Sequence, residues 1–327
     1  MKSFWQHFSR DWFLQGMILA VIAASFTPQW GRSGGPLHAD LLANLGIFAV
    51  FFLHGVGLST ESLLAGISRW RLHGAVQGFT YLIFPLIWLL ADLAFGRWLS
   101  PELRLGFFYL SVLPSTISSS VAMTALAGGN VPAAVFNASL SAVLGIFLTP
   151  LFVGLLLGAS GELSLLDAML KIAGLLLLPL VLGQIARRWW GGFFARYKPY
   201  TSVFDRCVIL WLVYASFCDS VAGGLWQKHG FGLLGQISIG ALVLLVLVLW
   251  LTRFAARRLG FDRRDEITLV FCGSKKTLAS GVPMAKLLFG AHPALGVIVL
   301  PIMIYHQIQL FVCALLARRY ALAEKQR

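Results

Sequence analysis

The sequence carries little charge for its length. Of its 327 residues, 12% are Asp, Glu, Lys or Arg and 58% are hydrophobic, and the mean hydropathy is +0.80. Soluble domains are about 25% charged and about 45–50% apolar, so this chain has too few charges to cover a folded surface in water. The 43 aromatic residues exclude disorder. The remaining class is a polytopic membrane protein, and the length accommodates about ten spans of about 20 residues.

Motifs for catalysis and metal binding are missing. Cys207, Cys218, Cys272 and Cys313 are scattered and form no CxxC motif, which argues against a disulfide scaffold or a metal centre. A Walker A sequence is absent, so ATP is not the expected energy source. His-Glu-x-x-His and Gly-x-Ser-x-Gly are absent too, so the usual intramembrane hydrolases lack support. The sequence predicts no enzyme and no cofactor, with Na⁺ or H⁺ as the possible coupling ion.

Apolar runs separated by glycine, proline or charge predict an all-α protein of ten transmembrane helices. The first run has no Ala-x-Ala cleavage site after it and is interpreted as a retained span. No hydrophilic stretch is long enough for a second, soluble domain. The expected limits are 12–28, 40–59, 74–95, 105–128, 132–157, 166–187, 206–223, 231–253, 266–289 and 293–316.

The basic residues are unevenly distributed among the loops. The chain has 26 Lys and Arg against 13 Asp and Glu, a net charge of +13. With the N-terminus in the cytoplasm, 18 of the 26 lie in inner loops and 5 in outer loops. Basic residues concentrate on the cytoplasmic side of membrane proteins, so both termini are expected there. The same segregation argues against nucleic-acid binding, which a basic soluble protein would suggest.

The fourth and ninth segments are broken by small polar residues. The fourth reads LPSTISSS over 113–120, and the ninth reads FCGSKKT over 271–277. Each is the fourth segment in a set of five, and five is odd, so the two sets are expected to be inverted repeats over 1–160 and 161–327. Unwinding a helix in lipid strands N–H and C=O groups, which is tolerated only where protein, water or ligand satisfies them. Paired breaks of this kind predict a transporter site.

Hydroxyl groups crowd the fourth segment. Hydroxyl and carbonyl oxygens suit Na⁺ or a polar solute. The alternative is that these side chains bond to helix carbonyls or line a close helix crossing. In the fifth span two polar residues four apart share a face, which suits either the same site or an interhelical hydrogen bond. The candidates are Ser115, Thr116, Ser118, Ser119 and Ser120, with Asn137 and Ser141.

Lys275 and Lys276, between Cys272 and Thr277, are the strongest candidates for a functional role. An ammonium at the bilayer centre costs at least about 2.5 kcal/mol on insertion scales, and two adjacent ones repel each other. They would repel a cation in their place and attract an anion. Burial disfavours the charged form, so a neutral lysine could carry a proton. Snorkelling is the alternative, and it is the expected fate of Lys286 near the segment end.

Other polar residues in the spans leave two interpretations open. Asp219 either pairs with a lysine or lies near the outer interface. His306 could relay protons, although an interhelical hydrogen bond is more common. Gln77 either lines the cavity or lies at the cytoplasmic end of its span beside His73. Gln309 stands in the same span as His306 and is a further candidate for the cavity or the proton relay. Residues 54–57 (HGVG) indicate close helix packing around glycines.

Five stretches spread over essentially the whole chain carry a family resemblance. They read FFLHGVGLS at 51–59 followed by WRLH at 70–73, LPSTISSS at 113–120, FCGSKKTLASGVP at 271–283 and YHQIQ at 305–309. They resemble the bile acid:sodium symporter superfamily, and most closely its bacterial branch allied to member seven of solute carrier family ten. The resemblance implies two inverted five-helix repeats, fourth and ninth helices that break and cross at mid-membrane, and a bacterial inner membrane.

The resemblance also shows where this chain departs from the superfamily. Other members hold sodium with a Ser-Asn pair, which corresponds by position to Ser119 and Ser120. A Glu and a Gln of their ninth helix correspond to Cys272 and to a position at or near Lys276, and a third-helix glutamine falls nearer Thr80 than Gln77. The sodium-binding carboxylate is missing, which leaves sodium coupling and the sodium site open. The hypothesis is that Lys275 or Lys276 replaces a bound sodium by fixed charge.

The leading interpretation is a secondary transporter of an organic anion, bile-acid-like or otherwise carboxylated. It would be uncoupled from sodium or driven by protons. Its expected partners are that small molecule and the bilayer, with no nucleic acid and no obligate protein. One alternative is a regulatory or ion-flux protein without solute turnover. A second is a lipid-modifying enzyme, for which Asp219 with His306 is a weak acid/base candidate.

Overall fold

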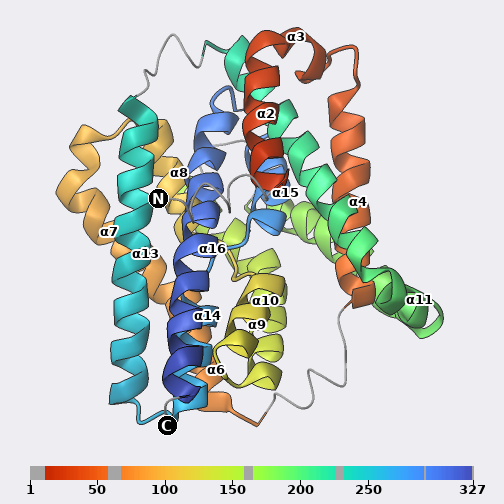
Figure 1. Cartoon of the computed structure of the whole chain (residues 1–327). Helices are drawn as coiled ribbons and strands as arrows, with labels where there is room; N and C mark the ends of the chain where they lie inside the picture. Colours follow the sequence, from red (N-terminus) through yellow and green to blue (C-terminus); the bar gives the residue numbers. More distant parts are fainter. Residues whose placement is uncertain (1–11, 58–67, 158–164, 225–231, 291, 326–327) are drawn as a thin grey trace. The chain divides into compact units, whose positions relative to one another are not determined.

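A computed structural model describes residues 12–57, 68–157, 165–224, 232–290 and 292–325 (Figure 1). All regular elements in these ranges are helices, and no strand occurs there, which confirms the all-α class. The elements are α2 Trp12–Phe26, α3 Pro28–Gly31, α4 Ala39–Gly57, α6 Trp70–Gly78, η1 Phe79–Ile83, α7 Phe84–Phe95, η2 Gly96–Trp98, α8 Pro101–Val112, α9 Ser118–Leu126, α10 Val131–Leu157, α11 Leu165–Ala222, α13 Gly232–Arg258, α14 Arg263–Gly273, α15 Leu278–Phe289 and α16 Leu295–Lys325.

Among the described residues, six continuous helical stretches are long and apolar enough to cross a membrane by length and composition. They match the second, third, fifth, seventh, eighth and tenth predicted spans. The fourth and ninth predicted spans are each divided into two short helices, and the first is a shorter apolar helix, Gln15–Phe26. The six stretches are Ala39–Gly57, Trp70–Trp98, Val131–Leu156, Tyr200–Ala222, Gly232–Arg258 and Leu295–Ala323.

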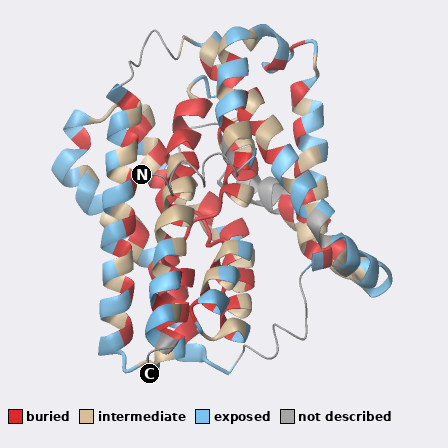
Figure 2. Cartoon of the chain, viewed as in Figure 1, coloured by how far each residue is buried: buried red, intermediate tan, exposed pale blue. Residues whose placement is uncertain are grey.

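Helix α13 illustrates why these helices belong in lipid. One stripe of the helix is buried and packs on α14. The opposite face is exposed and still apolar, including Trp250 at 60% and Ile239 at 67% exposure. Figure 2 shows buried and exposed residues alternating along its ribbon. A soluble helix would place polar residues on that face, so its solvent is expected to be hydrocarbon. The buried stripe is Leu233, Ile237, Ala241, Leu245, Val248, Thr252 and Ala256.

The sixth and seventh predicted spans are two helices that meet at a kink within α11. A polar loop is expected between residues 187 and 206, but α11 continues through it. Helical geometry is lost only at Tyr197 (φ −103°, ψ 16°), two residues before Pro199. A proline ring clashes with the preceding helical turn and removes one hydrogen bond, which bends the helix there. Figure 1 shows the two arms of α11 meeting at this bend.

The chain folds into two compact units, each drawn from both halves of the sequence. The first unit comprises Met1–Leu58, Leu170–Phe231 and Val282–Val299. The second comprises Ser59–Met169, Gly232–Gly281 and Leu300–Arg327. Long-range packing therefore groups the helices in a different way from their order along the chain. These packing units differ from the two predicted inverted repeats, which divide the sequence at residue 160. The inverted repeats stay a prediction.

In the first unit, α4 and α11 cross through a pair of glycines. A Cβ atom added at Gly55 would lie 2.1 Å from the carbonyl oxygen of Leu180, and one at Gly183 would lie 2.1 Å from that of Phe52. Small residues let membrane helices approach this closely, as expected from residues 54–57. Beside the crossing, Gln184 donates a hydrogen bond to the Gly55 carbonyl at 2.7 Å.

Gly55→Ala is expected to lower the thermal unfolding midpoint, because the new methyl group meets backbone that cannot rotate away. Overpacking a tight contact costs about 1–3 kcal/mol. Gly74→Ala is the matched control, since a Cβ there meets nothing within 4 Å and alanine favours the helix. Equal midpoints for both purified variants would contradict the crossing.

Candidate functional site

The second unit contains both predicted breaks, and they lie against each other. Helix α8 ends at Val112 and α9 begins at Ser118, while α14 ends at Gly273 and α15 begins at Leu278. Leu113 is extended (φ −71°, ψ 151°), as residues before proline prefer to be. The Thr277 amide donates to the Pro114 carbonyl at 3.0 Å and joins the two breaks directly.

Hydroxyl groups of the fourth segment satisfy backbone carbonyls of the ninth. Ser115 Oγ donates to the Cys272 carbonyl at 2.7 Å, and Ser120 Oγ donates to that of Phe271 at 3.2 Å. Thr116 Oγ1 lies 2.6 Å from Ser119 Oγ and 3.0 Å from Ser120 Oγ. Ser118 is exposed. The hydroxyl cluster is thus divided between hydrogen bonds to backbone carbonyls and a short hydroxyl chain, and its role as a binding site stays a prediction.

Lys276 points into a ring of three backbone carbonyls. Its Nζ donates to the oxygens of Thr80 at 2.8 Å, Ser111 at 2.7 Å and Leu113 at 2.7 Å. The side chain is fully buried, and Nζ lies 4.1 Å from the centroid of the Phe84 ring. An ammonium has three N–H donors, so every donor is used. A buried cation over an aromatic face gains further electrostatic stabilisation.

Two prolines explain why these carbonyls are available. In the π-helical turn η1, the Phe84 N–H donates to the Phe79 carbonyl, five residues back. With the same spacing, the next donor, which would bond to the Thr80 carbonyl, would be the N–H of residue 85. Residue 85 is a proline without an N–H, so Thr80 O has no helical donor. The carbonyls of Ser111 and Leu113, at the end of α8, likewise have no following helical turn to donate to them, because the chain breaks at Pro114. The negative end of the α8 dipole also favours a cation.

Lys275 is buried to the same degree but less completely bonded. Its Nζ donates to the Ser119 carbonyl at 2.7 Å and lies 5.7 Å from the Phe271 ring centroid. No second hydrogen bond from this ammonium is found within the described part of the chain. Two N–H donors therefore remain for another acceptor.

Helix α16 holds the ninth break from another side. Gln309 brackets the Lys276 backbone: its Oε1 accepts from the amide at 2.9 Å, and its Nε2 donates to the carbonyl at 2.8 Å. The same Nε2 lies 2.9 Å from Nδ1 of His306. Tyr305 OH donates to Ser274 O at 2.7 Å. These contacts give Gln309 and Tyr305 a positioning role for the lysine segment.

Helix α10 approaches the site through its polar face. Ser141 Oγ accepts from the Ser115 amide at 2.9 Å, and the Ser141 carbonyl accepts from Tyr81 OH. Asn137, four residues earlier, accepts from Gln77 Nε2 through its carbonyl at 3.0 Å. Ser141 thus contacts the broken fourth segment, whereas Asn137 is hydrogen-bonded to Gln77 of the third span.

Asp219 belongs to the first unit, where it pairs with a lysine. Lys286 Nζ lies 3.2 Å from Asp219 Oδ2, 3.2 Å from Asp40 Oδ1 and 3.3 Å from Ser33 Oγ. The Lys286 side chain is 8% exposed, so it is held by carboxylates of α4 and α11 and does not snorkel as expected. Of the two interpretations of Asp219, the structure favours lysine pairing.

The described residues that hydrogen-bond around the breaks offer a sodium ion no carboxylate, since none of them is an Asp or Glu. Cys272 Sγ, at the position of the superfamily's glutamate, lies 4.0 Å from the Ala134 carbonyl. The Lys276 ammonium already occupies the carbonyl ring that would otherwise attract a hard cation.

Several site residues give weak signals in the sequence. Thr80, Ser111 and Leu113 act through backbone carbonyls, which every residue possesses. Tyr305 and Tyr109 are buried tyrosines whose hydroxyls donate to Ser274 O and Gly281 O, each at 2.7 Å. A tyrosine within an apolar run could have marked them, because a buried phenol needs a partner.

Two helices break beside each other, and each satisfies backbone groups of the other, among apolar helices of membrane-spanning length. This arrangement is typical of a membrane transporter. Residues 11–322 match the sequence profile of the SBF-like CPA transporter family. The chain belongs to this family, whose members are transporters and not enzymes.

Individual relatives align with this chain over nearly the full length of both proteins. An uncharacterized protein of Pseudomonas aeruginosa is 49% identical over 315 residues, which cover 96% of this chain and 94% of the relative. A protein of Escherichia coli named "Putative symporter YfeH" is 45% identical and covers 95% and 92%. "Sodium/bile acid cotransporter 7" of Mus musculus is 33% identical and covers 94% and 91%.

Proposed function

We propose that this chain is a secondary active transporter that carries an organic anion by alternating access, with lysine ammonium groups in the place of bound sodium ions. Its ten helices form two inverted repeats in a bacterial inner membrane, with both termini cytoplasmic. The breaks support this arrangement because they occur at the fourth segment of each set of five and meet in one unit.

The main support for the proposal is the ring of three backbone carbonyls around the Lys276 ammonium. Three backbone carbonyls converge on one positive charge, which is how proteins coordinate hard monovalent cations. Here the cation is tethered to the chain and cannot be exchanged between the two sides of the membrane. Thr80 and Lys276 lie at or near the positions where the family resemblance implies sodium ligands. A fixed charge there removes the reason for sodium coupling.

Lys275 supplies the charge that an anion would meet. Lys276 donates all three of its N–H groups to backbone carbonyls of the chain. Lys275 donates one, so two of its N–H groups are left for a carboxylate or sulfate. Hydrogen bonds between an ammonium and a carboxylate are among the stronger ones in proteins. This division assigns Lys276 to the architecture of the site and Lys275 to the substrate.

Sodium-independent anion exchange is the expected behaviour. Purified protein is screened by thermal shift against cholate, steroid sulfates and small carboxylates, because a ligand that binds the folded state raises its unfolding midpoint. The best ligand is then used in a counterflow assay in liposomes, in buffers containing either sodium or choline. Saturable counterflow of equal rate in both buffers supports the proposal.

Two results would overturn it. Counterflow that requires sodium would show that the lysines do not replace the ion. Ligand binding without counterflow would favour a regulatory protein without solute turnover.

A further inference from the structure

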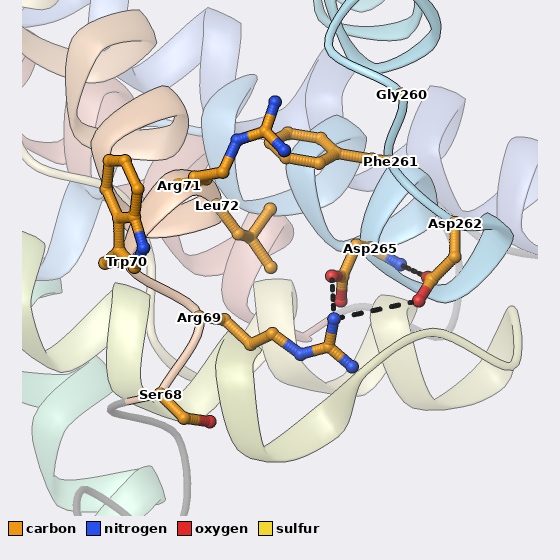
Figure 3. A pocket seen from close by; sticks show the side chains of 9 residues that line it. All are labelled: Ser68, Arg69, Trp70, Arg71, Leu72, Gly260, Phe261, Asp262 and Asp265. Carbon is orange, nitrogen blue, oxygen red and sulfur yellow. Dashed lines mark hydrogen bonds and ion pairs between the residues drawn. The ribbon is translucent and has the colours of Figure 1, made fainter.

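We propose that a pocket at one end of the second unit binds the headgroup of a zwitterionic phospholipid with a primary ammonium, such as phosphatidylethanolamine. The pocket has a volume of about 260 Å³ and lies between the start of α6 and the turn joining α13 to α14 (Figure 3). Sites for drug-sized ligands measure about 300–1,000 Å³, so this one suits a smaller group. It is lined by Ser68, Arg69, Trp70, Arg71, Leu72, Gly260, Phe261, Asp262 and Asp265.

The pocket lies where two membrane spans end. One candidate span begins at Trp70 and another ends at Arg258, so the lining residues 68–72 and 260–265 sit at the boundary of the apolar layer. Trp70 is 75% exposed at this boundary. Tryptophan concentrates at the level of lipid headgroups, where its ring has an apolar body and a polar N–H. The pocket is therefore placed at the depth of headgroups.

The lining contains two arginines and two aspartates. Arg69 lies 3.2 Å from the buried Asp265 and compensates its charge, as Figure 3 shows. Arg71 donates to the Leu259 carbonyl at 3.0 Å and stands over the Phe261 ring, and guanidinium has further N–H donors. Asp262 is 55% exposed, and its Oδ2 is 3.9 Å from Arg69. A guanidinium with free donors and a solvent-facing carboxylate together match a phosphate beside an ammonium.

This charge pattern discriminates among lipids. Phosphatidylethanolamine offers phosphate to Arg71 and N–H donors to Asp262. Phosphatidylcholine has a quaternary ammonium without N–H donors, and phosphatidylglycerol has no cation, so each loses the bond to Asp262. Because Asp262 is exposed, its ion pair with the lipid ammonium is screened by solvent and contributes about 0.2–1 kcal/mol, which corresponds to a difference in affinity of up to about five-fold.

The test measures binding of dioleoyl lipids with these three headgroups to the detergent-purified full chain by native mass spectrometry. Phosphatidylethanolamine should bind more tightly than the other two, by up to about five-fold. Asp262→Asn should remove this preference while keeping the helix start, because asparagine caps as well as the aspartate that accepts from Asp265 N–H here. Arg71→Gln should weaken phosphatidylethanolamine and phosphatidylglycerol alike.

Arg258→Gln is the matched control, since Arg258 is an exposed arginine at the same span end that does not line the pocket. It should leave all three affinities unchanged. The proposal would be overturned if the unsubstituted protein bound the three lipids equally. It would also be overturned if Arg71→Gln and Arg258→Gln lost the same amount of lipid affinity. Competition by soluble phosphoethanolamine as effective as that by the lipid would overturn the membrane assignment. None of these results depends on whether the protein transports an anion.

Discussion

Lys276→Ala is expected to cause a large loss of stability. The substitution leaves the carbonyls of Thr80, Ser111 and Leu113 buried without their donor. Breaking a buried charged network from one side costs about 3–5 kcal/mol. A midpoint shift of about 2–4 °C per kcal/mol for a domain of 150–250 residues predicts a decrease of roughly 6–20 °C in thermal unfolding of the purified protein.

The adjacent lysine provides the control for this prediction. Lys275→Ala removes an equally buried ammonium that has one carbonyl partner, so a smaller decrease is expected. Adding propylammonium to Lys276→Ala should restore part of the midpoint, because it carries the atoms that alanine lacks and binds only the folded state. Equal decreases in the two variants, with no recovery in propylammonium, would show that the carbonyl ring does not hold a cation.

The breaks could be predicted because their cause is local. Pro114 and a run of small polar residues cannot continue an apolar helix, and this information is present in a few neighbouring residues. The same holds for the glycines of 54–57, whose small size is visible in the sequence and whose packing the structure confirms.

The partners of the lysines could not be predicted, because a carbonyl acceptor carries no signature of residue type. Thr80 O is available through the missing N–H of Pro85, a backbone effect that composition and periodicity do not register. The partners of Lys286 could not be predicted either. Its position near the end of its segment suggested that it would snorkel. Asp40 and Asp219, far away in the sequence, hold it instead. Long-range packing also groups the helices into two units that their order does not reveal.

Lys275→Gln is expected to reduce counterflow of the transported anion by at least about ten-fold, with a modest change in the unfolding midpoint. The amide keeps one N–H donor for the Ser119 carbonyl but loses the positive charge that the anion requires. Loss of a charge-assisted hydrogen bond of about 1.5–3 kcal/mol accounts for a decrease of this size. The assay compares counterflow rates in liposomes at equal amounts of folded protein.

Lys275→Arg separates charge from shape. Arginine retains the positive charge and its donors, so it should restore part of the counterflow that glutamine loses, although its planar guanidinium fits the position differently. If glutamine and arginine reduce transport equally, the charge of Lys275 does not attract the anion, and its bond to Ser119 serves only to join the broken helices. If neither Lys275→Gln nor Lys276→Gln changes transport or its dependence on ions, the ammonium groups do not stand in for sodium.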